Sequence, residues 1–372
     1  MCKSCVDEYG VDINNVVLFD DRKKEVIVVL CRTRILMFFK RFLLGGVAML
    51  LLGTFLAACS SSKPKETAVT PKAVSTSKTI EFIPSSTATP YFTVAVYGGV
   101  KKEAAKYGYK TVMVGPAVST HVSTEIDTVR TAVARHVAGI VLVPYSPTAL
   151  VAPVKAAEKA GIPVAVVDST ITPMIANSFA AVNDVKGAEA AAKYAANYVN
   201  GKGEYGIIDY NLSTTSGRDR EKGFRQEMAK FPGMKYVATE ISNSVISTAL
   251  SEATTMLEHH PHINVMFGAN DRSAIGVAEA VERLHLQNKV VVVGFDADLG
   301  EVQLVKEGII KATVLQSPFL EGETGVEIIH DVLTHVHVPK TITLPFHVVT
   351  YKDYNTSTSI AAIRQYLPTY TG

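Results

Sequence analysis

Residues 264–296, NVMFGANDRSAIGVAEAVERLHLQNKVVVVGFD, contain two apolar runs separated by a segment with helical spacing. The runs Asn264–Gly268 and Val290–Asp296 are short and nearly continuous in apolar residues, which is typical of strands buried on both faces of a parallel sheet. Between them, Ser273–Leu284 has apolar residues three and four positions apart, as an amphipathic helix does. The stretch therefore predicts one strand–helix–strand unit of a parallel sheet.

The same alternation runs along most of the chain from Thr79 onward. The first series of predicted strands is Ile80–Pro84, Lys110–Val114, Gly139–Pro144 and Ile162–Asp168, and its predicted helices are Phe92–Tyr107, Thr124–Arg135 and Ala149–Ala160. A second series starts with a helix from Asn183-Asp184 to about Asn200. It continues with predicted strands Tyr205–Tyr210, Lys235–Thr239 and Ala312–Gln316 and predicted helices Gly217–Lys230, Ser247–His259 and Leu299–Lys306. Two such series predict an α/β fold of two similar lobes, each a doubly wound parallel sheet with helices on both faces, joined by hinge strands.

The composition of the 372 residues excludes several classes of protein. Hydrophobic residues make up 47%, which is too much for an intrinsically disordered chain and enough for the cores of two domains. The 37 Lys and Arg balance 35 Asp and Glu, so we expect no nucleic-acid partner. Four Cys are too few for a disulfide scaffold of this length.

An export signal is predicted at residues 37–58. A basic stretch ending at Lys40-Arg41 precedes Phe42–Leu56, fifteen residues without a charge, and Leu56-Ala57-Ala58-Cys59 follows. Fifteen residues are fewer than the ~20 that a membrane-spanning helix needs, and the order basic, apolar, small is that of a secretory signal peptide. Because Leu-Ala-Ala-Cys also resembles the bacterial lipobox, we expect Cys59 to be lipidated and to begin the mature chain. A plain signal peptide followed by an unrelated cysteine is the alternative.

The segments on either side of this signal are predicted to lie outside the folded lobes. A signal peptide normally starts its protein, so we expect translation to begin at Met37 and residues 1–36 to be a non-native extension. Residues 59–78 are rich in Ser, Thr, Pro, Lys and Ala without apolar periodicity, which predicts a flexible tether. Residues 1–58 hold eight Lys and Arg against six Asp and Glu, so the mature chain would carry 29 of each.

Polar and aromatic side chains stand where the predicted strands end. Ligands of open parallel sheets bind beyond the carboxyl ends of the strands, at the switch point of the topology. Planar carboxylate and amide groups, aromatic rings and a guanidinium together suit a polyhydroxylated ligand. The candidate ligand-binding residues are Thr89, Tyr91, Phe92, Asp168, Arg218, Asn270, Asp296 and Gln316.

Several candidates also have a structural role open to them. Asn270 and Asp296 each precede a predicted helix and can cap it. Tyr91 and Phe92 begin a helix and can belong to the core. Arg218 can be a solvated residue, although its spacing to Gly223-Phe224 favours it over its neighbours as the ligand arginine.

From about Thr79 to Tyr351 the chain resembles the type I periplasmic sugar-binding proteins, the ribose, galactose and autoinducer-2 group that supplies ABC transporters. The segments that carry the resemblance are Pro90-Tyr91-Phe92, Ile162-Pro163-Val164 leading to Asp168, Gly217–Phe224, Phe267–Asp271, Val293–Asp296 and Thr313–Gln316. The resemblance implies a first lobe of residues 79–182 plus about 317–345 and a second lobe of residues 183–316 plus about 346–372. It also implies that Tyr91 and Phe92 form an aromatic wall and that Asp168 accepts hydroxyl donors. Arg218, Asn270, Asp296 and Gln316 would then close over the ligand from the second lobe and the hinge.

Three departures from the family pattern leave the identity of the ligand open. Thr89 stands where family members for simple pentoses often have Asn, and Ser169 stands where they often have Arg. The segment Ser242–Val245 lacks the aromatic residue expected before the helix that follows.

The resemblance implies an extracytoplasmic substrate-binding lipoprotein that captures a sugar or sugar-like polyol and delivers it to the permease of an ABC importer. Its partners would be the small-molecule sugar, the ABC transporter permease and the membrane through the lipid anchor, and we expect a monomer. No cofactor, metal or catalysis is expected, since the sequence contains no Walker A or G-x-S-x-G motif and the adjacent His259 and His260 cannot face one way on a helix. A sensory sugar-binding module of the same fold, signalling to a chemoreceptor or membrane kinase, is the alternative.

Overall fold

The computed structural model describes residues 16–20, 25–29, 77–296, 298–367 and 370. The chain divides into two compact units, residues 1–68 and 69–372. The described residues of the first unit form an antiparallel pair of strands, β1 (Val16–Asp20) and β2 (Glu25–Val29), which sequence reasoning did not predict. The predicted signal peptide, Cys59 and nearly all of the predicted tether lie outside the described residues.

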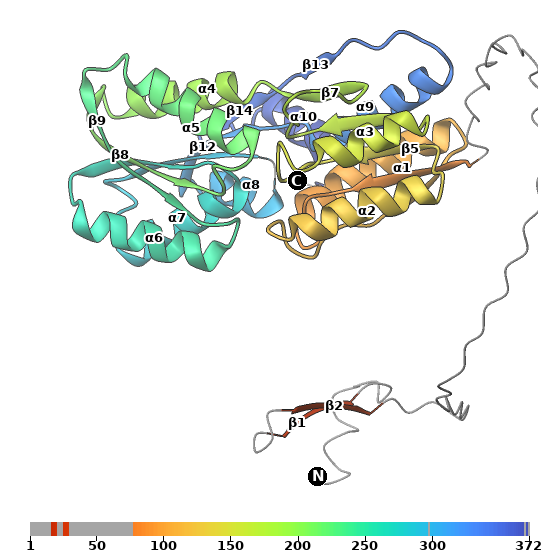
Figure 1. The fold of residues 1–372 in the computed structure, drawn as a ribbon. Coiled ribbons are helices and arrows are strands. Elements are labelled where there is room, and N and C mark those ends of the chain that lie inside the picture. Colours follow the sequence, from red (N-terminus) through yellow and green to blue (C-terminus); the bar gives the residue numbers. More distant parts are fainter. Residues whose placement is uncertain (1–15, 21–24, 30–76, 297, 368–369, 371–372) are drawn as a thin grey trace, which may run out of the picture. The chain divides into compact units, whose positions relative to one another are not determined.

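The second unit contains two six-stranded sheets, each the centre of one lobe (Figure 1). The first sheet is entirely parallel, with the order β13-β7-β6-β5-β3-β4. Its strands are β3 (Thr79–Ile83), β4 (Lys110–Met113), β5 (Gly139–Leu142), β6 (Val164–Val167), β7 (Ser178–Val182) and β13 (Thr341–Leu344).

Helices cover both faces of the first sheet. One face packs against α1 (Tyr97–Lys106) and α9 (Pro318–Leu333), and a π-helix, η2 (Tyr91–Val96), leads directly into α1. The other face packs against α2 (Val122–Ala134) and α3 (Val151–Lys159). Because both faces are covered, β5 and β6 are buried at every position, as their continuous apolar runs predict.

The second sheet has the order β14-β12-β11-β10-β8-β9, in which only the β12–β14 pair is antiparallel. Its strands are β8 (Lys202–Asp209), β9 (Gly233–Ile241), β10 (Ile263–Gly268), β11 (Val291–Phe295), β12 (Ile310–Leu315) and β14 (His347–Thr350). The helices on one face are α4 (Asp184–Tyr198) and α5 (Thr215–Met228). Those on the other are α6 (Ile246–His259), α7 (Asp271–Arg283), α8 (Leu299–Lys306) and α10 (Ser357–Tyr366).

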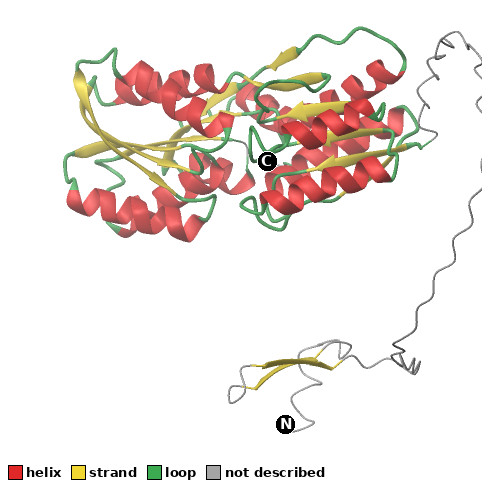
Figure 2. Ribbon diagram, in the orientation of Figure 1, coloured by secondary structure: helices red, strands yellow, loops and turns green. Residues whose placement is uncertain are grey.

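The predicted α/β fold of two doubly wound lobes is therefore confirmed, as Figure 2 shows by its layers of helices around strands. The chain passes between the lobes three times, from β7 to α4, from β12 to α9 and from β13 to β14. Sequence reasoning missed β7, α9, β13, β14 and α10 as separate elements.

Two glycines follow the ends of helices in the first lobe. Gly108 follows α1 with φ of 72°, and Gly161 follows α3 with φ of 81°. Only glycine adopts this left-handed conformation without steric cost, so each position favours termination of the helix.

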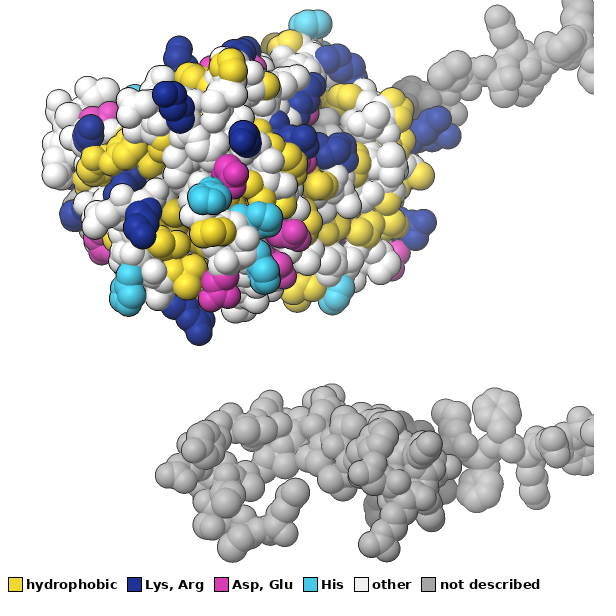
Figure 3. Space-filling view, turned by 90° about the vertical axis from the view of Figure 1, so that its left-hand side faces the viewer, with side chains coloured by type: hydrophobic (Ala, Val, Ile, Leu, Met, Phe, Trp, Pro, Cys, Tyr) yellow, Lys and Arg dark blue, Asp and Glu magenta, His cyan; other side chains and the backbone are white. Residues whose placement is uncertain are grey.

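Charged side chains are spread over the face of the second lobe that Figure 3 shows. On the end of the second lobe that faces the viewer in Figure 3, Lys and Arg side chains are scattered, with acidic, His and apolar side chains between them. Within the described part of the chain, no helix is both long and apolar enough to span a membrane.

Candidate functional site

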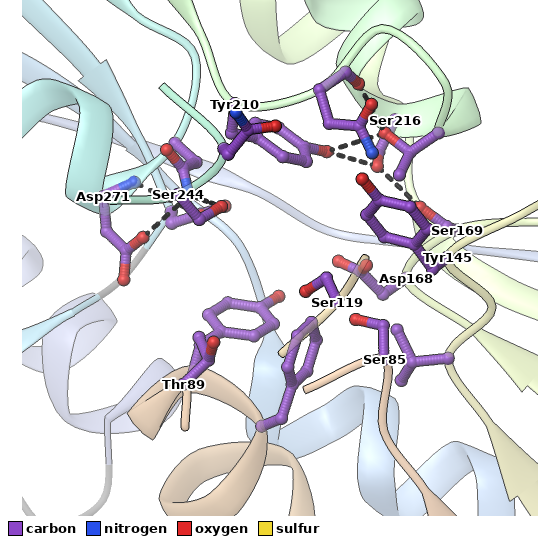
Figure 4. A pocket seen from close by; sticks show the side chains of 18 of the residues that line it. Ser85, Thr89, Ser119, Tyr145, Asp168, Ser169, Tyr210, Ser216, Ser244 and Asp271 are labelled. Carbon is purple, nitrogen blue, oxygen red and sulfur yellow. Dashed lines mark hydrogen bonds between the residues drawn. The ribbon is translucent and has the colours of Figure 1, made fainter. Parts of the chain in front are cut away.

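A cavity of about 270 Å³ lies between the two lobes, where the carboxyl ends of strands from both sheets face each other (Figure 4). The first lobe contributes the loops after β3, β4, β5 and β6, and the second contributes the segments after β8, β9, β10 and β11. This is the position that the topology of parallel sheets predicts for a ligand site. Its volume is close to the lower end of the ~300–1,000 Å³ usual for small-molecule sites.

Six of the eight candidate residues line this cavity: Thr89, Tyr91, Phe92, Asp168, Asn270 and Asp296. They come from four different loops separated by up to 207 positions. The tertiary fold therefore brings together residues that the sequence could relate only through their places at strand ends.

Arg218 does not line the cavity. Its side chain lies on the exposed side of α5, where Nη1 donates to the carbonyl oxygens of Leu212 and Ser213 at 3.1 and 3.0 Å. The arginine in the cavity is Arg220, which is 2% exposed. The Oγ1 atom of Thr214 accepts from the backbone N–H of Gly217 and caps α5, and the helix then buries Arg220 on the same face as Phe224.

Arg220 holds together two acidic residues from different parts of the second lobe. Its Nε donates to Asp184 Oδ1 at 2.8 Å, and its Nη1 donates to Asp296 Oδ1 at 3.0 Å and to the carbonyl oxygen of Ala269 at 2.8 Å. Its guanidinium lies over the ring of Phe295, 4.0 Å from the ring centre. These contacts fix Asp296 at the cavity wall by charge-assisted hydrogen bonds.

Gln316 lies behind the cavity wall instead of lining it. Its side chain is 1% exposed, and its Nε2 donates a hydrogen bond to Oδ1 of Asp296. It therefore supports Asp296, which faces the cavity.

Tyr91 and Phe92 form an aromatic corner at the start of η2. Their rings are 5.2 Å apart and nearly perpendicular, at 89°. Tyr91 lines the cavity and is also part of the core of the first lobe. Its hydroxyl donates to both carboxylate oxygens of Glu321 on α9, at 3.4 and 3.3 Å, which orients the ring.

The backbone is strained at two of the three aspartates that line the cavity. Asp168 has φ of 64° directly after β6, and Asp296 has φ of 105° directly after β11. A non-glycine residue with positive φ costs of the order of 1–3 kcal/mol and persists where the surrounding structure enforces it, commonly at ligand sites. In both lobes this conformation occurs at the carboxyl end of a strand that borders the cavity.

The sequence left a helix-capping role open for both Asn270 and Asp296, and only Asn270 caps the helix that follows it. The Oδ1 of Asn270 accepts from the backbone N–H of Ser273 at 3.0 Å, so Asn270 caps α7 while also lining the cavity. The cap of α8 is Asp298 and not Asp296. Asp296 is held by Arg220 and Gln316, and its Oδ2 also accepts from the backbone N–H of Asp271, the first residue of α7, at 3.4 Å.

Burial raises the pKa values of the carboxyl groups around the cavity. The pKa of Asp168 rises to about 8, mainly because the side chain is desolvated, and the attraction of Arg220 only partly opposes this. Desolvation raises the pKa of Asp184 to about 6 and that of Asp296 above its usual value, again against the effect of Arg220. Among the described residues that line the cavity, Arg220 is the only Lys or Arg, so one cation faces several acids.

Sequence reasoning missed many residues of the cavity besides Arg220. The rest of the lining consists of Ser85, Val118, Ser119, Thr120, Val143, Pro144, Tyr145, Ser169, Tyr210, Asn211, Thr214, Ser216, Asn243, Ser244, Val245 and Asp271. Tyr210 ends a predicted strand, and Asp271 comes shortly after one. The rule that ligands bind at the carboxyl ends of parallel strands could therefore have included both. Tyr145 directly follows the predicted strand Gly139–Pro144 and was open to the same rule, whereas Ser119 lies further along its loop and Ser216 lies in the first turn of α5.

The arrangement offers hydrogen-bond acceptors, hydroxyl groups and aromatic faces, and it suits binding of a hydroxyl-rich small molecule. Within the described ranges, no group of three or more His, Cys, Asp and Glu side chains is placed to hold a metal ion. The run from His259 to His262 is exposed at the end of α6.

Comparisons with known proteins agree with this geometry. The model of the periplasmic binding protein domain family matches residues 80–335. The chain is 26% identical over 297 residues to the ribose import binding protein of Bacillus subtilis, covering 80% of this chain and 95% of that protein. It is 28% identical over 288 residues to the D-ribose/D-allose-binding protein of Pseudomonas aeruginosa, covering 75% of this chain and 88% of that protein.

Solved structures with bound sugars are also similar. A carbohydrate transporter solute binding protein from Agrobacterium radiobacter, in complex with D-arabinose, has a TM-score of 0.74 and 28% identity and covers 77% of this chain and 99% of its own. An ABC transporter solute binding protein from Agrobacterium vitis, bound with α-D-tagatopyranose, has a TM-score of 0.72 and 27% identity over 76% of this chain and 98% of its own.

Proposed function

The chain belongs to the periplasmic binding protein family, and we propose that it binds a sugar or sugar-like polyol between its two lobes and delivers it to an ABC importer. The observation that carries the proposal is the cavity at the carboxyl ends of both sheets, with an aromatic corner on one side and carboxylates and amides on the other. The relatives named above are sugar-binding and solute-binding proteins, and catalysis on the ligand is no part of the proposal.

Each lobe would hold one side of the ligand. Asp168 accepts hydroxyl donors from the first lobe, and Asp296 and Asn270 do so from the second. The rings of Tyr91 and Phe92 cover the apolar C–H side of the sugar ring. Because the ligand touches both lobes only when they are closed, binding shifts the population from open to closed.

The experiment that tests this proposal is a thermal-shift screen of the purified chain against pentoses, hexoses, polyols and autoinducer-2. A ligand at 100 times its Kd adds ~2.7 kcal/mol to the free energy of unfolding, so a true ligand gives a clear rise in melting temperature. Asp296→Asn is expected to abolish the rise, and the exposed Arg218→Ala is the matched control that keeps it. A panel without any shift in the wild type would reject the sugar class.

The family implies an extracytoplasmic location, and we propose the finer layout from the sequence. Residues 37–58 serve as a lipoprotein signal peptide, Cys59 carries the lipid and residues 59–78 form a tether to the folded unit. Residues 1–36 are then a non-native extension that precedes the true start at Met37. The two lobes of one chain complete the cavity, which supports a monomer as the binding unit.

A further inference from the structure

Acidic side chains outnumber basic ones in the wall of the cavity. Asp168, Asp271 and Asp296 line it, and Arg220 is the single Lys or Arg among the described lining residues. Arg220 is itself matched by two carboxyl groups, because it forms ion pairs with Asp184 at 2.8 Å and with Asp296 at 3.0 Å. Within the described part of the chain, no ion pair includes Asp168 or Asp271, and Oδ2 of Asp271 is buried there without a hydrogen-bond partner. The wall therefore has an excess of acidic groups that no protein cation balances.

Asp168 is the acidic group that the first lobe presents to a ligand. Its carboxyl points into the cavity in Figure 4, and the residue is 9% exposed. The other ionisable groups that interact with it electrostatically are Arg220, Asp184, Asp296, Tyr91, Tyr210 and Glu321, of which only Arg220 is basic. Since Arg220 already pairs with two of these acids, a positively charged group on the ligand is the counter-ion that this arrangement favours.

Aromatic side chains stand beside these acids. Tyr91, Phe92, Tyr145 and Tyr210 all line the cavity. The face of an aromatic ring carries partial negative charge and attracts a cation within about 6 Å, in addition to covering apolar C–H groups. Acidic groups and aromatic rings together favour a ligand that combines hydroxyl groups with a positive charge, and they disfavour a sugar acid or a sugar phosphate.

We propose that the cavity selects an amino sugar or amino polyol, whose ammonium group pairs with Asp168 beside the aromatic rings while its hydroxyl groups bind the second lobe. This inference rests on the proposed function, since it names the class of sugar that the same cavity takes. An ammonium group offers three N–H donors, and a charge-assisted hydrogen bond is about twice as strong as a neutral one. The ammonium group therefore gains more from Asp168 than the hydroxyl group of a neutral sugar does.

The protonation of Asp168 distinguishes an amine from a neutral sugar. In the ligand-free protein, desolvation raises the pKa of Asp168 to about 8. A cation beside a carboxyl group favours its ionised form and lowers its pKa. Binding of an ammonium group at neutral pH is thus expected to release a proton from Asp168 to the buffer, whereas a hydroxyl group brings no charge that would cause this ionisation.

The test is isothermal titration calorimetry of the purified chain with matched sets of ligands. Glucosamine, galactosamine and mannosamine are each compared with the parent sugar and with the N-acetylated form, and glucamine is compared with sorbitol. We expect the amine of at least one set to bind about 10-fold more tightly than its uncharged counterparts. Titrations in two buffers of different ionisation enthalpy measure the release of the proton.

One substitution separates the charge of Asp168 from its shape. Asp168→Asn keeps the size of the side chain, and Asn tolerates the positive φ of 64° at this position. The variant is expected to bind the amine no more tightly than the parent sugar and to release no proton. Asp127→Asn is the matched control, because the Asp127 side chain is 70% exposed and pairs with Arg130 on the surface of α2. Circular dichroism verifies that both variants are folded.

Parent sugars that bind the wild type as tightly as their amines would overturn the inference and leave the proposed function standing. A preference for the amine that survives in Asp168→Asn would overturn it as well. If none of these ligands and no member of the thermal-shift panel binds the wild type, the proposed function is rejected and the inference with it.

Discussion

Arg220 carries a positive charge into a region where the surrounding ionisable groups are acidic. Burial of an ion pair costs desolvation energy, and the mutual attraction offsets that cost only when both partners are present and hydrogen-bonded. Here Arg220 bonds to Asp184 and Asp296 at once, and Gln316 bonds to Asp296 from behind. A single residue therefore stabilises this region and also positions a carboxylate that lines the cavity.

Arg220→Ala is expected to lower the free energy of unfolding by about 3–5 kcal/mol, because it leaves two buried carboxyl groups without their cation. Chemical denaturation at neutral pH measures the loss. Arg218→Ala, two positions earlier on the same helix, is expected to change it by no more than about 0.5 kcal/mol. Similar losses for the two variants would contradict the assignment of Arg220.

The raised pKa of Asp168 gives the ligand-free protein a defined pH dependence. In the folded protein this carboxyl keeps its proton up to about pH 8, whereas its usual pKa is 3.8. The folded state therefore binds more protons than the unfolded state between these values, and its stability is lost as the pH rises through them. The pKa values of Asp184 and Asp209, both raised to about 6, act in the same direction.

Asp168→Asn removes one of these titrating groups, so the free energy of unfolding is expected to fall less steeply between about pH 4 and pH 8 than in the wild type. Urea denaturation at a series of pH values measures the two slopes. Parallel slopes would show that Asp168 titrates normally in the folded protein.

At the scale of elements, the close contact between α9 and the η2–α1 segment positions the aromatic corner. Gly99 on α1 and Gly322 on α9 each face the backbone of the other helix, and a Cβ atom on Gly322 would overlap the carbonyl oxygen of Val96. The short approach lets Glu321 of α9 reach Tyr91 of η2. Two glycines without a side chain thus permit the helix packing that orients a wall of the cavity.

Gly322→Ala is expected to destabilise the protein by about 1–3 kcal/mol, because the added methyl group forces the two helices apart. It is also expected to weaken sugar binding, since η2 carries Tyr91 and Phe92. Denaturation and ligand titration measure the two effects. Gly108→Asn is the control, because its surroundings are open and Asn tolerates its positive φ, and a comparable loss there would argue against helix packing as the cause.

At the scale of the whole molecule, we expect the unit of residues 69–372 and the predicted lipid anchor to have separate tasks. The cavity is built within the folded unit, and Cys59 precedes that unit in the sequence. Binding and membrane attachment are therefore expected to be separable by a single substitution.

Cys59→Ser is expected to move the protein from the membrane fraction to the soluble fraction and to abolish labelling by a lipid precursor. Sugar binding should remain unchanged, because the residues that line the cavity lie between Ser85 and Asp296. Membrane fractionation and metabolic labelling in a bacterial host measure the first two effects. Retention of the variant in the membrane fraction would exclude Cys59 as the anchor.

The sequence by itself determined the architecture of the two lobes. Short apolar runs and helical spacing are local signals, and each βα unit that they predict packs in the same way, so the parallel sheets followed directly. The elements that were missed, such as α9 and β13, lie where the chain crosses between the lobes and the regular alternation stops. The strand-end rule also identified Asp168, Asn270 and Asp296, because their positions depend on topology alone.

Only the tertiary structure decided which side chains face the cavity and what holds them there. Arg218 and Arg220 are two positions apart, about 200° around the helix, so the exact phase of α5 separates an exposed arginine from a buried one. Several hydrogen bonds at the cavity join residues that are distant in sequence. Gln316 bonds to Asp296, Tyr91 bonds to Glu321, and Ser169 of the first lobe bonds to Ser216 of the second. Such contacts depend on how whole elements pack, and a pattern of neighbouring residues carries no information about that packing.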